Sequence, residues 1–294
     1  MAEQTLPRPS TAGAITSVVK AIALLRESPV GMIGFGLVAF WVLVAILADI
    51  LSPYDPNATM VPLALPGAAA PDGGTFWLGT DLLGRDILSR IIYGSRRVLL
   101  YAPVATFCAY LVGIPMGLAA GYRGGRVDAV LSFISNVILS FPVLVLYVIV
   151  ITTIGSSGLN ILIAITFASA PGIMRIVRGL ALDLKNREYV FAAETRGESW
   201  IRIMFVEILP NARGPLIVDS CLRLGYVIIT IGVLGFLGLG LPPPDPDWGG
   251  MINEMRQMAM SFPHMTVFPC IAISSLVLGF NLLADGLREI SLKD

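Results

Sequence analysis

Long apolar stretches recur along the chain and are separated by shorter polar segments. A helix needs about 20 residues to cross a hydrocarbon layer of about 30 Å. Six apolar stretches of roughly this length are bounded by charged residues, Pro or Gly. The pattern predicts an all-α membrane protein with six transmembrane helices. The predicted spans are residues 31–51, 98–120, 129–154, 160–182, 215–241 and 266–287.

Prolines lie inside four of these spans, where each removes a backbone hydrogen bond. Neighbouring helices can satisfy the carbonyl groups that a proline frees, so we expect kinks in these spans rather than breaks. The prolines are Pro103, Pro115, Pro142, Pro171 and Pro269.

Basic residues indicate which connections face the cytoplasm, because short loops rich in Lys and Arg resist movement across the membrane. The second connection holds Arg123 and Arg126, and the fourth holds seven basic residues between positions 175 and 213. The third connection has none and the fifth has only Arg256. Both termini are therefore expected in the cytoplasm. The first connection carries four arginines on the expected outer side, but the rule is weak for a connection of this length.

The spans divide the chain into four parts. Residues 1–30 are expected to form a cytoplasmic N-terminal segment, and residues 31–51 the first transmembrane helix. Residues 52–97 then form an extracytoplasmic loop with an interfacial helix, and residues 98–290 a core domain of five transmembrane helices. A cytoplasmic loop at about 183–214 belongs to this core domain.

Two segments of the extracytoplasmic connection differ in character. Residues 64–74 are rich in Ala, Gly and Pro, which predicts a pliable loop. From Arg85 to Val98, apolar residues alternate with polar ones at roughly helical spacing. This pattern predicts a helix in the outer membrane interface that leads directly into the second span.

Composition supports a membrane location and excludes some partners. Hydrophobic residues make up 55% of the chain and charged residues only 14%, which is more apolar surface than a soluble core of this length can bury. Twenty basic residues balance twenty acidic ones, so no excess charge attracts nucleic acid. The three cysteines are far apart in sequence and His264 is the only histidine. We therefore expect no metal site and assign His264 to loop structure.

Aromatic and methionine side chains near the predicted boundaries have simple interpretations. Four aromatic residues are expected to anchor the chain in the lipid interface. They are Trp41, Tyr54, Trp77 and Trp248. Three methionines have helical spacing in the last outer connection, and the sequence leaves open whether they contact a partner or pack inside the fold. They are Met251, Met255 and Met258.

The fourth connection is long, charged and expected in the cytoplasm. A helical run leads up to Arg196, and Gly197 can adopt the positive φ that lets the chain reverse. Ser199 suits the N-cap of a second helical run, which is expected to end at Pro210. The pattern predicts a helical hairpin that projects from the membrane and contacts another protein.

Small residues in this hairpin carry a family resemblance. Ala192 and Ala193 are small enough for close approach by another helix. With Gly197, and with Leu209 and Pro210 further on, they resemble the EAA loop of permease subunits of ATP-binding-cassette importers. The pattern of that loop is Glu-Ala-Ala, three residues, Gly, and later Leu-Pro.

Other segments agree with this resemblance. Residues 77–90, from Trp77 to Arg90, are similar to the segment before the second span in the dipeptide and oligopeptide branch, specifically in its "C" permease. Residues 121–125, 236–240, 247–249 and 281–288 continue the likeness. It covers roughly residues 27 to 290, and the agreement of several motifs in order makes it specific.

The resemblance implies a type I ABC importer permease fold in the bacterial plasma (inner) membrane. It implies a heterodimer with a sibling permease, two cytoplasmic ATP-binding subunits and an extracytoplasmic substrate-binding protein. ATP and Mg²⁺ are then bound by the partner subunits, and this chain is expected to need no cofactor and to be no enzyme. Independently, the chain contains no Gly-x-x-x-x-Gly-Lys-Ser/Thr segment that could cradle nucleotide phosphates.

In this family the short helix of the EAA loop sits in a groove of the ATPase, and its movement tilts the membrane helices so that the cavity faces alternate sides. By resemblance, the residues that couple the chain to the ATPase are Ala192, Ala193, Glu194, Gly197, Trp200 and Pro210. The chain departs from the pattern at two places, because Phe191 replaces the first Glu and Glu207 replaces a residue that is often basic or His. We therefore expect the contact between this loop and the ATPase to differ from the contact in relatives.

Departures inside the spans indicate possible pathway residues. In the third span, Phe133 and Asn136 stand where relatives commonly carry an Arg and an Asp. In the fifth span, Ile231 replaces the usual acid, whereas Asp219 and Arg223 appear earlier and share one helix face. Ionisable groups in a membrane are costly, so this pair either faces the pathway or neutralises itself against neighbouring helices. Asn136, Asp219 and Arg223 are the candidate pathway residues.

The preferred function is therefore the permease subunit of an importer for short peptides, which moves di- or oligopeptides inward by alternating access when a partner hydrolyses ATP. Nickel or glutathione import by the same branch remains open, because the sequence does not reveal the ligand. A secondary transporter driven by an ion gradient should show inverted repeats or paired intramembrane acids, and Asp219 alone is thin support. A membrane enzyme ranks last, because no nucleophile with a base, metal cluster or phosphate cradle is visible.

Overall fold

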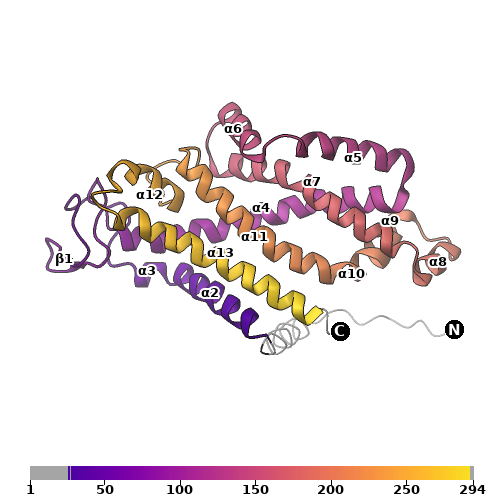
Figure 1. The fold of residues 1–294 in the computed structure, drawn as a ribbon, viewed down its shortest axis with the longest axis horizontal. Helices are drawn as coiled ribbons and strands as arrows, with labels where there is room; N and C mark the ends of the chain where they lie inside the picture. The colour runs from indigo at the N-terminus through magenta and orange to yellow at the C-terminus, as the bar shows by residue number, and fades with distance from the viewer. Residues whose placement is uncertain (1–25, 27, 292–294) are drawn as a thin grey trace.

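Helices dominate the computed structural model, which describes residue 26 and residues 28–291 (Figure 1). Most of the expected N-terminal segment, residues 1–25, lies outside the described residues. The long helices are α2 (Pro29–Ile46), α4 (Ile87–Arg123), α5 (Gly125–Leu139), α6 (Val143–Ile154), α7 (Gly158–Leu184), α11 (Arg213–Phe236) and α13 (His264–Ser291). The short ones are α3 (Ala48–Leu51), α8 (Glu188–Thr195), α9 (Trp200–Arg202), α10 (Leu209–Asn211) and α12 (Trp248–Met255).

Five of the described helices are long and apolar enough to cross a membrane: α2, α4, α7, α11 and α13. The pair α5 and α6 is a sixth candidate if the two helices count as one span. The six apolar stretches of the sequence thus correspond to five helices and one bent pair.

Proline has different effects at different positions. Pro103 and Pro115 lie inside α4, Pro171 inside α7 and Pro269 inside α13, so these helices continue through their prolines. The expectation of a kink is wrong at Pro142, where α5 ends at Leu139 and α6 starts after the proline at an angle of 87° to it. Pro142 has an extended backbone (φ −57°, ψ 123°), and a proline also disfavours helical geometry in the residue before it.

The expected interfacial helix forms the first part of α4 and is not a separate element. Asp86 caps it, because its Oδ2 accepts a hydrogen bond from the backbone N–H of Ser89 at 2.8 Å. Ile87 and Ile91 are buried rather than turned to an interface. They are covered by the outer part of the fold, where the indole Nε1 of Trp248 donates a hydrogen bond to the Ile91 carbonyl (3.0 Å).

Helices α4 and α7 pack closely because small residues face the contact. A Cβ atom at Gly113, Gly117 or Gly121 would lie 2.5–2.7 Å from side-chain atoms of α7. At Gly117 the nearest atom is the Cβ of Val177, at 2.5 Å. Glycine every fourth residue therefore gives α4 a flat face on which α7 lies, as in other closely packed membrane helices.

Two of the expected lipid anchors belong to the core instead. Trp41 is 7% exposed and Trp248 is fully buried; their rings meet edge to face, with centroids 5.0 Å apart. The Nε1 of Trp41 donates a hydrogen bond to the hydroxyl of Ser275 (3.0 Å), so helix contacts rather than lipid headgroups satisfy it. Met251 and Met255 are also buried, which favours packing over a contact surface at these two methionines.

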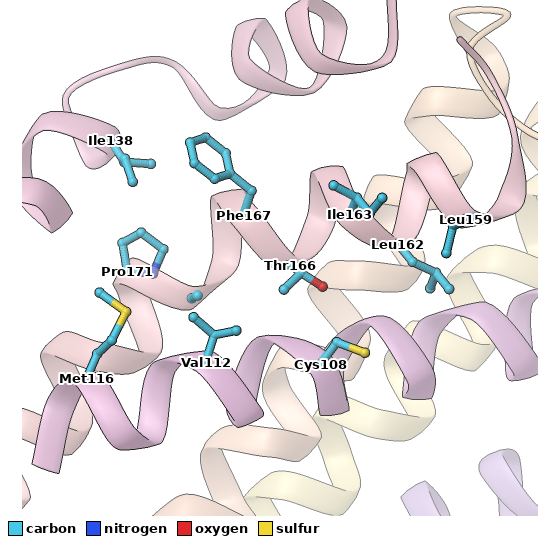
Figure 2. A pocket seen from close by; sticks show the side chains of 11 residues that line it. Cys108, Val112, Met116, Ile138, Leu159, Leu162, Ile163, Thr166, Phe167 and Pro171 are labelled. Carbon is cyan, nitrogen blue, oxygen red and sulfur yellow. The ribbon is translucent and has the colours of Figure 1, made fainter. Parts of the chain in front are cut away.

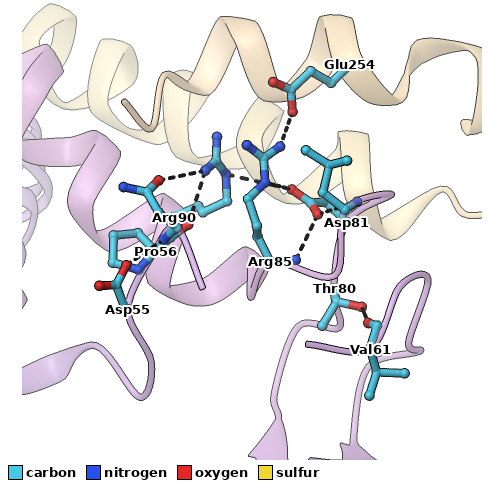
Figure 3. A network of polar contacts seen from close by, with 10 residues as sticks. Asp55, Pro56, Val61, Thr80, Asp81, Arg85, Arg90 and Glu254 are labelled. Atoms are coloured by element: carbon cyan, nitrogen blue, oxygen red, sulfur yellow. Dashed lines mark hydrogen bonds and ion pairs between the residues drawn. The ribbon is translucent and has the colours of Figure 1, made fainter. Parts of the chain in front are cut away.

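The connection between α3 and α4 forms a cap at one end of the molecule (Figure 1). It contains a two-stranded antiparallel hairpin, β1 (Ala68–Ala69) and β2 (Thr75–Phe76), in place of a wholly irregular loop. An ion network joins this cap to α12 (Figure 3). The Nε of Arg85 contacts Asp81 at 2.6 Å, and its Nη2 contacts Glu254. Nearby, burial raises the pKa of Asp247, the N-cap of α12, to about 6.

The Arg85→Met variant is expected to lower the free energy of unfolding by up to about 3–5 kcal/mol, because it removes the cation that contacts Asp81 and Glu254. Asp81 then keeps only its longer contact with Arg90, at 3.9 Å. Arg97→Met is the matched control: the Arg97–Asp245 pair spans 2.6 Å but is over a third exposed, so its loss should cost at most about 1 kcal/mol. Thermal unfolding of both variants in detergent measures the difference. Equal melting temperatures would show that the network does not hold the cap.

Candidate functional site

The hairpin predicted from the sequence is present at residues 188–211, at the opposite end of the molecule from β1 (Figure 1). Helix α8 ends in a Schellman motif, in which the N–H of Gly197 donates to the Glu194 carbonyl (2.9 Å) and the N–H of Glu198 to the Ala193 carbonyl (3.2 Å). Gly197 has φ +75°, which confirms the predicted turn. Ser199 caps the next helix, since its hydroxyl accepts from the N–H of Arg202.

One face of α8 is anchored in the fold and the other is open. Val190 and Ala193 are fully buried and belong to a cluster with Ile203 and Ile208. Ala192 is exposed beside Phe191, whose side chain is 53% exposed. The two alanines of the motif therefore have different positions: Ala193 holds α8 to its own chain, and Ala192 is available to a partner.

The second run of the hairpin does not end at Pro210, contrary to the sequence prediction. It passes through a π-helix (Ile203–Ile208) into α10, where Pro210 occupies the first turn. Proline is tolerated in the first turn of a helix, because the N–H that it lacks would have no acceptor there. The π-helix before it forms hydrogen bonds between residues five apart instead of four. The hairpin is thus almost continuous with α11, which starts at Arg213.

Contacts also connect the hairpin to the end of α4. The hydroxyl of Tyr122 lies 2.8 Å from Glu194 Oε1, to which it donates a hydrogen bond. The guanidinium of Arg123 lies over the ring of Trp200, 4.8 Å from its centroid. Sequence reasoning did not assign Tyr122 or Arg123 to the site. The motif at residues 121–125 was the only sequence signal for these two residues. Their contact with the hairpin depends on the tertiary fold and leaves no local pattern in the sequence.

Charged side chains stabilise the turn of the hairpin. Arg196 pairs with Glu198 at 2.7 Å, and Arg202 pairs with the same carboxylate at 3.2 Å. Arg196 also reaches Glu207 at 3.5 Å. Glu207, a departure from the family pattern, therefore has a partner within the hairpin.

The three candidate pathway residues do not form one cluster. Asp219 and Arg223 pair on one face of α11, with Oδ2 and Nε 2.7 Å apart, and the hydroxyl of Tyr110 on α4 donates to the same carboxylate. Asn136 lies on α5, where its side-chain oxygen accepts a hydrogen bond from Arg175 on α7 (3.1 Å). Asn136 is thus tied to α7 rather than to the pair on α11.

A pocket lies between α4, α7 and the end of α5 (Figure 2). Its volume is about 520 Å³, and its lining is apolar apart from Cys108 and Thr166. Such a surface offers no partner for the charged termini of a short peptide. Among residues 28–291, no group of three or more His, Cys, Asp or Glu side chains is placed to hold a metal ion.

The fold matches that of a known importer. The chain resembles a solved structure of the MetNI methionine ABC transporter in an inward-facing conformation, with a TM-score of 0.58 and 18% sequence identity over 69% of this chain and 97% of that chain. At this identity the likeness concerns the fold alone. The fold, with its charged hairpin at one end, is that of a type I ABC importer permease.

Sequence comparisons find relatives with higher identity than this structural neighbour. Residues 113–293 match the family described as "Binding-protein-dependent transport system inner membrane component", and residues 20–71 match the "N-terminal TM domain of oligopeptide transport permease C". The chain is 37% identical to the dipeptide transport system permease protein DppC of Alkalihalophilus pseudofirmus, over 92% of this chain and 88% of the relative. It is 38% identical to the glutathione transport system permease protein GsiD of Pectobacterium atrosepticum, over 86% and 81%.

The chain belongs to the family of binding-protein-dependent transport system inner membrane components. It is a multi-pass membrane permease of the ABC importer class, which works with ATPase partners. Because the chain belongs to this family, it is assigned neither to the ion-gradient-driven transporters nor to the membrane enzymes, which the sequence had left as alternatives.

Proposed function

We propose that this permease imports short peptides, and that ATP hydrolysis by separate subunits drives the transport. Relatives named as dipeptide permeases support this cargo, among them DppC of Alkalihalophilus pseudofirmus at 37% identity and DppC of Haemophilus influenzae at 36%. Glutathione is a second candidate, because GsiD of Pectobacterium atrosepticum is similar at 38% identity. Both cargoes are short peptides with free carboxylates.

The proposed assembly contains this chain, a sibling permease, two ATP-binding subunits that hold ATP and Mg²⁺, and an extracytoplasmic substrate-binding protein. The hairpin at residues 188–211 faces the cytoplasm together with both termini, in the plasma (inner) membrane of a bacterium. Its basic residues support this orientation. The cap at the opposite end then faces the binding protein.

The coupling role rests on one observation: α8 has an open face, is hydrogen-bonded to α4 through Glu194, and packs on the segment that leads along the chain into α11. Ala192 and Glu194 on α8, with Trp200 on α9, present their exposed surfaces to the ATPase. Ala193 and the Gly197 turn hold α8 in place, and Pro210 lies where the hairpin passes into α11. A displacement of α8 by the ATPase is therefore transmitted to α4 through the Tyr122–Glu194 bond and to α11 through α10.

Reconstitution tests this proposal. The chain is purified with its co-expressed neighbours, placed in liposomes with ATP, and assayed for ATP hydrolysis and for uptake of a dipeptide, glutathione and nickel. Dipeptide or glutathione uptake that requires both ATP and the ATP-binding subunits supports the proposal. Uptake of nickel alone, or peptide uptake in liposomes that contain only this chain, contradicts it.

A further inference from the structure

A polar stripe runs along α11 through the middle of an apolar span. Its members are Asp219, Arg223, Tyr226 and Thr230, separated by four, three and four residues. This spacing places all four on one face of the helix. Arg223 is the eleventh residue of α11, so it lies about 15 Å from the start of the helix, near the middle of a hydrocarbon layer about 30 Å thick.

Polar groups from three other helices face this stripe. The hydroxyl of Tyr110 on α4 donates a hydrogen bond to the carboxylate of Asp219. Beyond Arg223, a small cavity of about 50 Å³ is bordered by Thr106 of α4, Tyr147 of α6 and Ser169 of α7. Arg223, Tyr226 and Thr230 of the stripe also line it, together with the apolar residues Ala109, Ile173 and Val227. The stripe is therefore the edge of a polar seam rather than four isolated polar residues.

Arg223 retains hydrogen-bonding capacity after it has paired with Asp219. A guanidinium carries five N–H donors, and Asp219 Oδ2 lies 2.7 Å from Nε. The two terminal nitrogens lie beside Gly172 of α7, where a Cβ would be 3.3 and 3.5 Å from them. The missing side chain at Gly172 leaves space next to these donors, and Arg223 lines the cavity there.

The open end of the seam is unsuited to lipid. Tyr226, three residues after Arg223 on the same face, is 69% exposed. A partly exposed arginine and tyrosine in the middle of a span are costly against hydrocarbon and are expected to face protein or a water-filled cavity. A permease needs such a polar surface where its cargo passes.

We propose that this polar stripe lines the translocation pathway and that Arg223 binds the carboxylate of a passing short peptide. The inference rests on the proposed function. Guanidinium and carboxylate pair through two parallel hydrogen bonds, and the terminal nitrogens of Arg223 form the free edge for this pairing. Tyr110 and Arg223 together hold Asp219, so that its charge is balanced when no cargo is present.

The test compares two cargoes in the reconstituted complex with its binding protein: a dipeptide with a free carboxylate and the same dipeptide as its amide, loaded to equal occupancy. The wild-type complex should import the free acid about tenfold faster, since a hydrogen bond between charged groups is lost with the amide. In the Asp219→Asn/Arg223→Gln double variant, which removes both charges with similar shapes, import of the acid should fall about tenfold and the preference should disappear. Arg223→Lys should keep part of the preference.

The outcomes separate the two proposals. If the wild-type complex imports neither cargo, the proposed function fails. If it imports peptide and the double variant still prefers the free acid, the role of Arg223 is wrong although the function stands.

A labelling experiment covers the case in which the double variant does not assemble. Tyr226→Cys is introduced into a chain whose native cysteines are replaced by serine, with Ile229→Cys as the control. Ile229 is 42% exposed but lies about 90° around the helix from the stripe. A membrane-impermeant thiol reagent should label position 226 and not position 229, and the free-acid dipeptide should protect position 226. Absence of labelling at position 226, or labelling that the peptide does not reduce, overturns the inference.

Discussion

Gly197→Val is expected to abolish coupled import while membrane insertion and ATP hydrolysis by the assembled complex continue. Gly197 has φ +75°, a conformation that a β-branched residue strongly resists. The strain is about 1–3 kcal/mol, enough to change the Schellman turn that positions α8. No atom lies within 4 Å of a Cβ built at this position, so the effect comes from the backbone and not from a clash. Parallel measurements of peptide uptake and ATP hydrolysis in liposomes detect the uncoupling.

Gly197→Asn is the matched control for this variant. Asparagine adopts positive φ more readily than other residues with a side chain, and open space surrounds the position. Uptake by the Asn variant should therefore stay close to that of the wild type. If Gly197→Val also imports at the wild-type rate, Gly197 has no part in the mechanism.

Gly117→Leu is expected to prevent stable packing of α4 on α7. A Cβ at Gly117 would lie 2.5 Å from Val177 Cβ and 2.7 Å from the Met174 carbonyl oxygen. Neither atom belongs to a flexible chain end, so the helices must separate. Overpacking of this kind costs about 1–3 kcal/mol or more. The yield of monodisperse protein and its melting temperature in detergent measure the loss.

Gly179→Leu provides the control, because Gly179 lies on α7 and no atom is within 4 Å of its Cβ position. It introduces the same side chain into the same helix pair at an open site. A melting temperature close to that of the wild type is expected for this variant. Equal destabilisation by the two substitutions would mean that close approach at Gly117 is not what holds α4 and α7 together.

Local rules predicted much of the fold from the sequence. Spans about 20 residues long were visible because a helix that crosses lipid must be apolar over most of its length. The turn at Gly197 and the cap at Ser199 were predictable for a similar reason, since both depend on backbone chemistry within a few residues. The structure confirms these two elements with a positive φ and a capping hydrogen bond.

Tertiary contacts account for the failures. Proline lies in the interior of α4, α7 and α13 without ending them, yet Pro142 separates two helices at 87°, and no local signal distinguishes these cases. Trp248 lies near a predicted boundary but is fully buried, and its Nε1 donates a hydrogen bond to the Ile91 carbonyl of α4. The contact of Tyr122 with Glu194 joins residues 72 positions apart, which no periodicity can reveal.

The central claim is that an ATP-hydrolysing partner acts on the exposed face of α8 from the cytoplasm. Ala192→Cys, in a chain whose three native cysteines are replaced by serine, tests it most directly because Ala192 is exposed on α8. A membrane-impermeant maleimide should label this cysteine only from the cytoplasmic side, and assembly with the ATP-binding subunits should protect it. Labelling from the outside, or equal labelling with and without those subunits, would contradict the claim.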